Sequence, residues 1–297
     1  MKKWWLKLII QKFISLLPVK HRINLLFQRH ITRGAILTQD YYEDKITHFR
    51  THRKLWDEKH DNPAPKVLEL GTGWFPVIPI AFWLTGVKQV MTIDLSRLCR
   101  AVDAQDTVKL FLQLADSGKL NLGGDYNLAR IEELRAVVNS PDPMAELGIK
   151  YIIGDAAQLP DADGSIDLIV SNNVLEHVSE SALNSIFKKF GKLISPNGLS
   201  SHFVDMSDHF AHLDKSITVF HFLRYSPSTW NIIDNSIQPQ NRLRAPFFRN
   251  LFINTGHQIE EELVISKNEA LIKQEPVHPS FGNEDLGLYH VHWALAK

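Results

Sequence analysis

The sequence predicts an α/β fold built on a doubly wound parallel sheet. From about residue 66 onward, strand-like runs alternate with helix-like runs. An apolar content of 44% over 297 residues is enough for a large buried core. Such alternation is typical of a sheet with helices on both faces, whose ligands bind at the carboxyl ends of the strands.

Seven strands are predicted, in chain order at 66–71, 89–96, 149–156, 165–174, 199–207, 257–266 and 289–297. Helical patterns lie between them at 76–86, 108–120, 126–140 and 181–198. The first helix opens with prolines and ends at Gly86. The last is amphipathic and ends at the turn Pro196-Asn197-Gly198. Its apolar face consists of Leu183, Ile186, Phe187, Phe190 and Leu193.

Residues 1–60 are expected to form a helical extension. Residues 1–39 contain eight lysines and arginines and no acid, although the whole chain has 33 of each charge. Lys7 and Lys12 interrupt the apolar run, which argues against a membrane span and against a signal peptide. Two interpretations stay open. The first helix either packs on the body of the protein, or docks on a membrane surface or a partner through its tryptophans and lysines.

Residues suited to ligand binding follow three of the strands. The first strand ends in Glu69-Leu70-Gly71-Thr72-Gly73, where glycines allow a tight turn and a close approach to the backbone. Asp94 ends the second strand, about 20 residues past this turn, where a carboxylate holds a ribose diol. Asp155 ends the third strand and can accept a hydrogen bond from a base. This combination predicts a nucleoside-containing ligand.

Together with DLIVSNNVLEHV at 167–178, these motifs resemble class I S-adenosylmethionine-dependent methyltransferases over roughly residues 64–205. The resemblance implies a Rossmann-like seven-stranded methyltransferase sheet, and S-adenosyl-L-methionine as the cofactor. It also implies a role for each matching position. Glu69, Gly71 and Gly73 would face the methionyl part, Asp94 and Leu95 the ribose, Asp155 and Ala156 the adenine, and Asn172 the methyl-transfer site.

Two features depart from the family pattern. Trp74-Phe75-Pro76 stands where a third glycine is common. S-adenosylmethionine carries no phosphate, so this helix end need not be a phosphate cradle. Trp74 either walls the cofactor pocket or packs on the next helix. Asp94 and Asp155 are about twice as far apart as the ≈30 residues of one βαβ unit. This predicts a helical insertion at about 105–145, serving as a lid, a partner surface or a peripheral bundle.

Histidines and acids after the fourth and fifth strands are the candidates for acceptor chemistry. The expected catalytic residues are His177, His209, His212 and Asp208. Histidine titrates near neutrality and suits proton abstraction from a hydroxyl. We expect His209, next to Asp208, to be the base, with His177 as second choice. The same loop could instead hold a metal ion or be purely structural, and no metal ligand is assigned.

Residues 208–255 are expected to form a substrate cap. Its arginines could pair with a phosphate or carboxylate of the acceptor, although surface ion pairs are the favoured interpretation. They are Arg224, Arg242, Arg244 and Arg249. A nucleic-acid partner is disfavoured, because the overall charge is zero and no RNA-binding domain is visible.

The predicted function of the domain at 61–297 is methyl transfer to an oxygen or nitrogen of a small molecule, glycan or lipid-linked intermediate. The alternative is a catalytically silent S-adenosylmethionine-binding scaffold. Aminopropyl transfer is disfavoured, since Asn172-Asn173 is less anionic than a polyamine pocket requires. The single cysteine, Cys99, excludes an internal disulfide and suggests a cytoplasmic protein. Contact of the basic N-terminus with the inner face of the membrane stays open.

Overall fold

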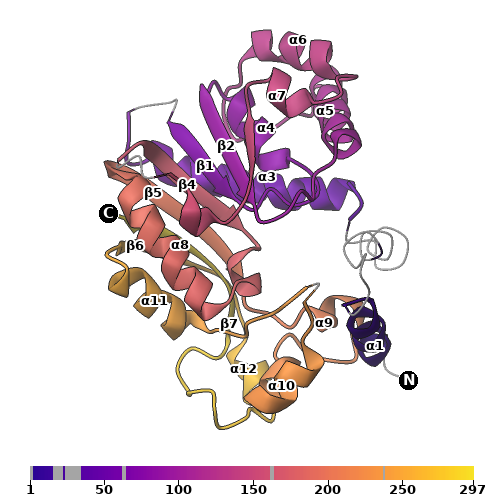
Figure 1. Cartoon of the computed structure of the whole chain (residues 1–297), viewed down its shortest axis with the longest axis vertical. Helices are drawn as coiled ribbons and strands as arrows, with labels where there is room; N and C mark the ends of the chain where they lie inside the picture. Colours follow the sequence, from indigo (N-terminus) through magenta and orange to yellow (C-terminus); the bar gives the residue numbers. More distant parts are fainter. Residues whose placement is uncertain (1–2, 16–22, 24–34, 62–64, 161–163, 237) are drawn as a thin grey trace.

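The computed structural model describes residues 3–15, 23, 35–61, 65–160, 164–236 and 238–297. Its centre is a seven-stranded sheet in the order β3-β2-β1-β4-β5-β7-β6 (Figure 1). The strands are β1 (Lys66–Leu70), β2 (Gln89–Asp94), β3 (Lys150–Ile153), β4 (Ile166–Asn172), β5 (Ile194–Asp205), β6 (Gln258–Lys267) and β7 (Leu288–Ala296). β7 runs antiparallel to β5 and β6, and the pairs among β1 to β5 are parallel. The predicted Rossmann-like α/β sheet is confirmed.

Helices cover both faces of the sheet. One face packs against α3 (Gln39–Asp57), α4 (Val77–Leu84), α5 (Ala101–Asp116) and α6 (Leu128–Val137). The other packs against α8 (Glu180–Leu193) and α11 (Ala245–Asn254). Every residue of α4 is buried, as expected of a helix that is apolar all round. α8 buries the five apolar residues predicted for its core face, and Ser179 caps its N-terminus.

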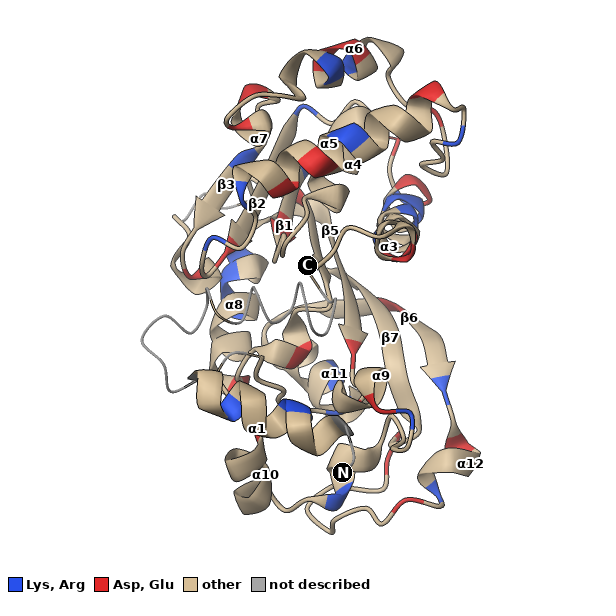
Figure 2. Ribbon diagram, turned by 90° about the vertical axis from the view of Figure 1, so that its right-hand side faces the viewer, with Lys and Arg blue, Asp and Glu red and all other residues tan. Residues whose placement is uncertain are grey.

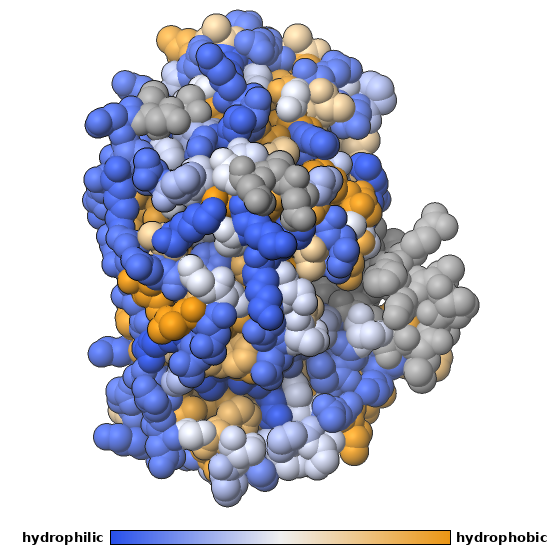
Figure 3. Space-filling model, turned by 60° about the vertical axis from the view of Figure 1, so that its left-hand side comes forward, coloured by the Kyte–Doolittle hydropathy of each residue, from blue (hydrophilic) through white to orange (hydrophobic). Residues whose placement is uncertain are grey.

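The region predicted as an insertion is helical. α5, α6 and the short α7 (Pro143–Glu146) lie between β2 and β3. Figure 2 shows acidic and basic residues interspersed on α3, α5 and α6. This mixture differs from the single-sign patch that nucleic-acid binding uses. The face shown in Figure 3 is also largely hydrophilic, with apolar side chains in small groups.

A third apolar cluster is separate from the two that flank the sheet, and its helices are drawn in the lower part of Figure 1. It joins α1 (Lys3–Ser15) to α9 (Phe210–Leu213), the turn η3 (His221–Arg224), α10 (Pro227–Ile233) and α12 (Glu269–Ile272). Trp4 and Leu8 of α1 pack into this cluster. The backbone N–H of Trp4 donates to Asp214 Oδ2 (3.1 Å), and Lys12 Nζ donates to the carbonyl of Asp234 (2.7 Å). The inner face of α1 is therefore packed on the cap.

The strand predicted at 199–207 begins earlier than expected. β5 starts at Ile194 and contains the Pro196-Asn197-Gly198 segment that was predicted as a turn. The pairing register with β4 shifts between Ile166 and Leu168 at this point. A Cβ on Gly198 would lie only 2.8 Å from the carbonyl oxygen of Asp167 in β4. The backbone of the irregular segment therefore approaches β4 too closely for a side chain at this position.

Among the described residues, the helices are all too short or too polar to cross a bilayer.

Candidate active site

Two glycines in left-handed conformations shape the turn after β1. Gly71 has a φ of +83° and Gly73 one of +69°, values that other residues adopt at a cost. A Cβ on Gly71 would lie 2.4 Å from Val174 Cγ2, so the turn is pressed against the segment after β4. A Cβ on Gly73 would meet nothing within 4 Å. The backbone at Gly73 is therefore open to a ligand.

Glu69 lies below this turn, only 3% exposed. Its Oε2 accepts a hydrogen bond from Thr92 Oγ1 (2.9 Å), and the hydroxyls of Thr92 and Thr72 are bonded to each other. Burial raises the pKa of Glu69 to about 8, although the bond from Thr92 opposes the shift. A positively charged ligand would favour its ionised form, so this site suits a cation.

Asp94 ends β2 beside the same turn. Tyr151 donates its hydroxyl proton to Asp94 Oδ2 (2.9 Å). Burial raises the pKa of Asp94 to about 6, while Tyr151 and the backbone N–H groups of Gly73 and Thr72 act to lower it. Leu95, the next residue, is 80% exposed. An ionised Asp94 can accept hydrogen bonds from a diol, and Leu95 offers apolar surface beside it.

Asp155 lies one strand further along the same edge. The backbone N–H of Gly154 bonds to the carbonyl of Asp94 (2.9 Å), which ties the ends of β2 and β3 together. Asp155 is exposed, and its Oδ1 accepts a hydrogen bond from the N–H of Ala157 (2.9 Å). Ala156 is buried. The predicted segments thus lie at the ends of four adjacent strands. Across the sheet, the order is 155–156 after β3, 94–95 after β2, 69–73 after β1, and 172 at the end of β4.

Asn172 at the end of β4 belongs to a buried polar chain. His52 Nε2 donates to Asn172 Oδ1 (2.9 Å), His52 Nδ1 accepts from Ser201 Oγ (2.7 Å), and Ser201 Oγ accepts from His292 Nε2 (2.7 Å). Burial lowers the pKa of His52 to about 3, so the ring is neutral. The chain fixes the orientation of Asn172 and leaves its buried Nδ2 without a partner. That donor is available to a ligand.

α3 also reaches the ends of the strands. Lys45 Nζ donates to Asn173 Oδ1 (2.7 Å), and Asn173 has a positive φ of 54°. Neither Lys45 nor His52 was predicted from the sequence, because both lie far from the glycine turn in the chain. Their alignment on one face of α3 becomes visible only when that helix is placed on the sheet.

Asp205, at the end of β5, holds two histidines. His290 Nε2 lies 3.1 Å from its Oδ1, and His209 Nε2 lies 3.4 Å from its Oδ2. Burial acts to raise the pKa of Asp205, but the two rings outweigh this effect and hold it well below its usual range. Asp205 is therefore the ionised neighbour of His209.

Asp208 does not have the place expected of it. We predicted that it lies beside His209, but its Oδ2 faces His221 Nδ1 (3.4 Å) and its Oδ1 accepts from the N–H of Phe210. The loop turns after Asp205, so neighbouring residues point in opposite directions. Asp208 is 1% exposed and faces the interior of the cap. Asp205, and not Asp208, is therefore the carboxylate beside His209.

The turn η2 (Leu175–His177) brings a second pair of residues to His209. Asn241 Nδ2 fixes this turn by donating to the carbonyls of Leu175 (2.7 Å) and Val178 (2.8 Å). Glu176, His177 and His209 each place one possible ligand atom within 4.8 Å of the others. Burial raises the pKa of Glu176 well above its ordinary value, and burial lowers that of His177 to about 4.

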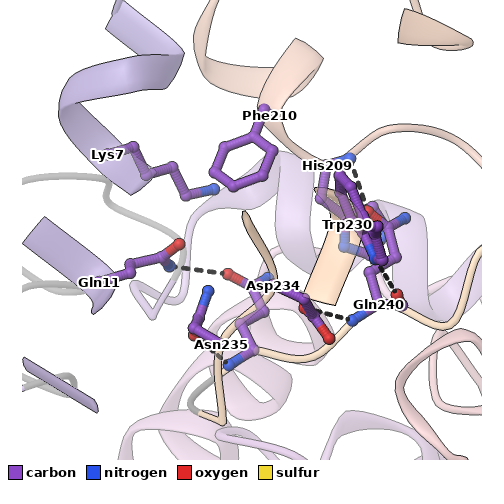
Figure 4. Close-up of a pocket in the computed structure, with 9 residues that line it drawn as sticks. Lys7, Gln11, His209, Phe210, Trp230, Asp234, Asn235 and Gln240 are labelled. Carbon is purple, nitrogen blue, oxygen red and sulfur yellow. Dashed lines mark hydrogen bonds between the residues drawn. The ribbon is translucent and has the colours of Figure 1, made fainter. Parts of the chain in front are cut away.

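A small pocket between α1 and the cap opens beside His209 (Figure 4). It is lined by Lys7, Gln11, His209, Phe210, Trp230, Asp234, Asn235, Gln238 and Gln240. Most of these side chains are polar, and burial lowers the pKa of Lys7. His212 is the most exposed candidate, with 56% of its side chain open to solvent, and it lies 3.9 Å from Asp205.

The four arginines of the cap have partners within the protein. Arg224 pairs with Glu275, and Arg249 pairs with Glu262 and Asp285. The buried guanidinium groups of Arg242 and Arg244 donate to backbone carbonyls. The favoured interpretation, surface ion pairs, describes Arg224 and Arg249, whereas Arg242 and Arg244 are internal braces. Trp74 is partly buried and packs against the apolar core between the sheet and the helices α3, α4 and α5.

Comparison with known proteins adds to this geometry. Residues 107–201, from α5 to β5, match the sequence model of a family described as a methyltransferase domain. The strand order and the glycine turn followed by two acids agree with this match. The chain therefore contains a methyltransferase domain, on a sheet of the class I S-adenosylmethionine-dependent methyltransferase type. The open backbone at Gly73, the buried Glu69 and the unpaired Asn172 Nδ2 suit its cofactor, S-adenosyl-L-methionine.

The methyltransferase is also similar to solved structures. One from Mesorhizobium loti, an S-adenosylmethionine-dependent methyltransferase, is 16% identical, with a TM-score of 0.45, over 83% of this chain and 96% of its own. A Pyrococcus horikoshii protein is 14% identical, with a TM-score of 0.47, over 88% and 92%. A Methanosarcina mazei methyltransferase is 13% identical, with a TM-score of 0.46, over 81% and 96%. No curated protein matches the chain.

Proposed function

We propose that this methyltransferase acts on a hydroxyl oxygen of a small molecule, a glycan or a lipid-linked intermediate. The observation that supports the proposal is the carboxylate–histidine cluster of Asp205, Glu176, His177 and His209, just beyond Asn172 at the ends of β4 and β5. A hydroxyl attacks poorly until it loses its proton. Neutral amines need no such help, so a buried cluster that can promote proton loss favours an oxygen acceptor.

The reaction requires alignment and removal of one proton. The acceptor oxygen forms a bond to the methyl carbon as the bond from that carbon to sulfur breaks, and S-adenosylhomocysteine leaves. The cofactor supplies the activated methyl group when bound. Asn172 lies at the methyl-transfer end of β4, and its orientation by His52 limits the geometry of attack.

The test is formation of S-adenosylhomocysteine by the purified protein with pools of sugars, phenols, amines and lipid extracts as acceptors. We expect turnover with a hydroxyl-bearing pool, and mass spectrometry should place the new methyl group on oxygen. A methylated amine as the main product would overturn the oxygen assignment. Cofactor binding without turnover on any pool would favour the silent scaffold instead.

We also propose that α1 brings the protein to an anionic membrane surface. One face of α1 packs on the cap, yet Trp5, Leu6, Ile9 and Phe13 on the other face are 43–65% exposed. An exposed apolar helix face is typical of helices that lie in a membrane interface, and the eight lysines and arginines of residues 1–39 would attract anionic lipid. Such contact would suit a lipid-linked acceptor.

Sedimentation with anionic vesicles tests this contact. Ile9→Ser and Phe13→Ser change the outer face and leave the packed residues Trp4 and Leu8 in place. We expect the unmodified protein to sediment at low salt and to be released at higher salt, and the double variant to stay in solution. Equal sedimentation of both proteins would refute this role for α1.

A further inference from the structure

Three residues on the acceptor side form an arrangement that acid–base chemistry alone does not explain. Glu176, His177 and His209 come from the turn after β4 and the loop after β5, and their ligand atoms lie within 4.8 Å of one another. The rings of His177 and His209 are 4.9 Å apart between centroids, at an angle of 66°. Two imidazoles and one carboxyl group therefore lie close together.

The hydrogen bonding of His177 leaves its second ring nitrogen free to coordinate. Its Nδ1 donates to the carbonyl of Pro239 (2.6 Å), so Nε2 carries the lone pair. Metal-bound histidines usually donate their other N–H to a carbonyl or carboxylate, which fixes both tautomer and ring orientation. Asp205 lies beside His209, with 3.4 Å between its Oδ2 and Nε2 of the ring.

Glu176 is the second, independent observation. The residue is 2% exposed, and neither of its carboxyl oxygens has a hydrogen-bond partner of good geometry, although the backbone N–H groups of Glu176 and Asp205 lie near enough to act on its pKa. A buried carboxyl group without a partner costs stability, because its hydration is lost and not replaced. The backbone of Glu176 is fixed, since its carbonyl accepts from the N–H of Asn241 (2.9 Å). The unsatisfied oxygens are thus held in place beside two imidazoles.

We propose that Glu176, His177 and His209 bind one divalent transition-metal ion. Two imidazoles and one carboxylate form the ligand set of catalytic zinc sites, which keep a further position open. Manganese, cobalt and iron(II) accept the same donors, whereas magnesium prefers oxygen ligands alone. The site faces the acceptor side, close to Asn172.

This site deepens the proposed function, on which its catalytic role rests. A hydroxyl bound in the open position would have a lowered pKa and become a nucleophile at neutral pH. The proton would pass to solvent or a nearby base, and the oxygen would then attack the methyl carbon. His209 would serve as a ligand and not as the base, so the two routes are experimentally distinct.

Direct metal binding tests the site without acceptor or cofactor. Metal-stripped protein is titrated with cobalt(II), followed by the visible absorption of the bound ion, and zinc is then used to displace it. We expect one equivalent to bind at micromolar or lower concentration. Glu176→Gln and His209→Ala should each weaken binding by at least about 100-fold, since even second-shell changes cost 10–100-fold. Zinc should also raise the melting temperature of the unmodified protein alone.

His278→Gln is the matched control, because His278 lies in the loop before β7 and its Nδ1 pairs with Ser280 (2.9 Å). It should bind cobalt normally. His209 is partly exposed, with 13% of its side chain open to solvent, so His209→Ala should fold even if Glu176→Gln does not. No binding, or equal binding by His209→Ala, would overturn the site. If the metal binds but no hydroxyl is methylated, only the proposed function fails.

Discussion

The two sides of the active site are built in different ways. The predicted cofactor side consists of short loops that directly follow β1, β2 and β3, so each predicted contact would come from a few consecutive residues. The acceptor side combines His52 of α3, Glu176 of η2, His209 after β5 and His290 and His292 of β7. The first side is set by local sequence and strand order. The second depends on long-range packing.

The largest expected effect is on the acceptor side. His177→Gln or His209→Gln should reduce turnover about 10²–10⁴-fold, whether the histidine acts as base or as metal ligand. Cofactor affinity should stay near its original value, because neither ring touches the glycine turn or Asp94. Steady-state kinetics and calorimetry measure the two quantities separately. Near-normal turnover in both variants would mean that alignment alone drives transfer, and the contrast between the two sides would be lost.

Asp94→Ala should have the opposite profile. Removing the carboxylate deletes charge-assisted hydrogen bonds and should cost about 1.5–3 kcal/mol of cofactor affinity. Turnover at saturating cofactor should change much less. Calorimetry with S-adenosylhomocysteine gives the affinity, and Asp155→Ala provides a comparison at an exposed position. Unchanged affinity in a folded Asp94→Ala protein would count strongly against this site.

Substitutions at the two glycines of the turn should distinguish a role in packing, at Gly71, from a role in ligand access, at Gly73. Gly71→Ala should destabilise the fold by about 1–3 kcal/mol, since its Cβ would collide with Val174 at a positive φ. Gly73→Ala has open space and should cost only about 1 kcal/mol for its conformation. Thermal unfolding gives both values, and binding measurements should show that Gly73→Ala loses cofactor affinity. Equal melting temperatures would contradict the close approach of the two loops.

The pH dependence of cofactor binding should give the smallest effect. Asp94 has a pKa raised to about 6, and the ribose hydroxyls would favour its charged form, so binding releases its proton. The contribution of Asp94 to affinity should therefore be complete above about pH 7 and fall as pH drops through 6, approaching tenfold per unit. Glu69, with its pKa near 8, adds a second slope at higher pH. Asp94→Asn should remove the lower slope, and an unaltered profile would assign it to another group.

The sequence by itself determined the sheet and placed the residues predicted to bind the cofactor at its strand ends. Alternating apolar runs require a layered α/β core, because each run must bury one face. The spacing of Glu69, Gly71 and Asp94 then fixes which groups end adjacent strands. All seven predicted strands are present, and only the start of β5 differs appreciably.

Only the tertiary structure decided the acceptor side. Sequence proximity suggested that Asp208 orients His209, but the loop turns it towards His221 and places Asp205 there. The partners of Asn172 lie 120 and more positions away, as its bond to His52 shows. The unpaired carboxyl of Glu176 is equally invisible in the sequence. Side-chain direction in an irregular loop follows from packing against distant segments, and no local pattern encodes that packing.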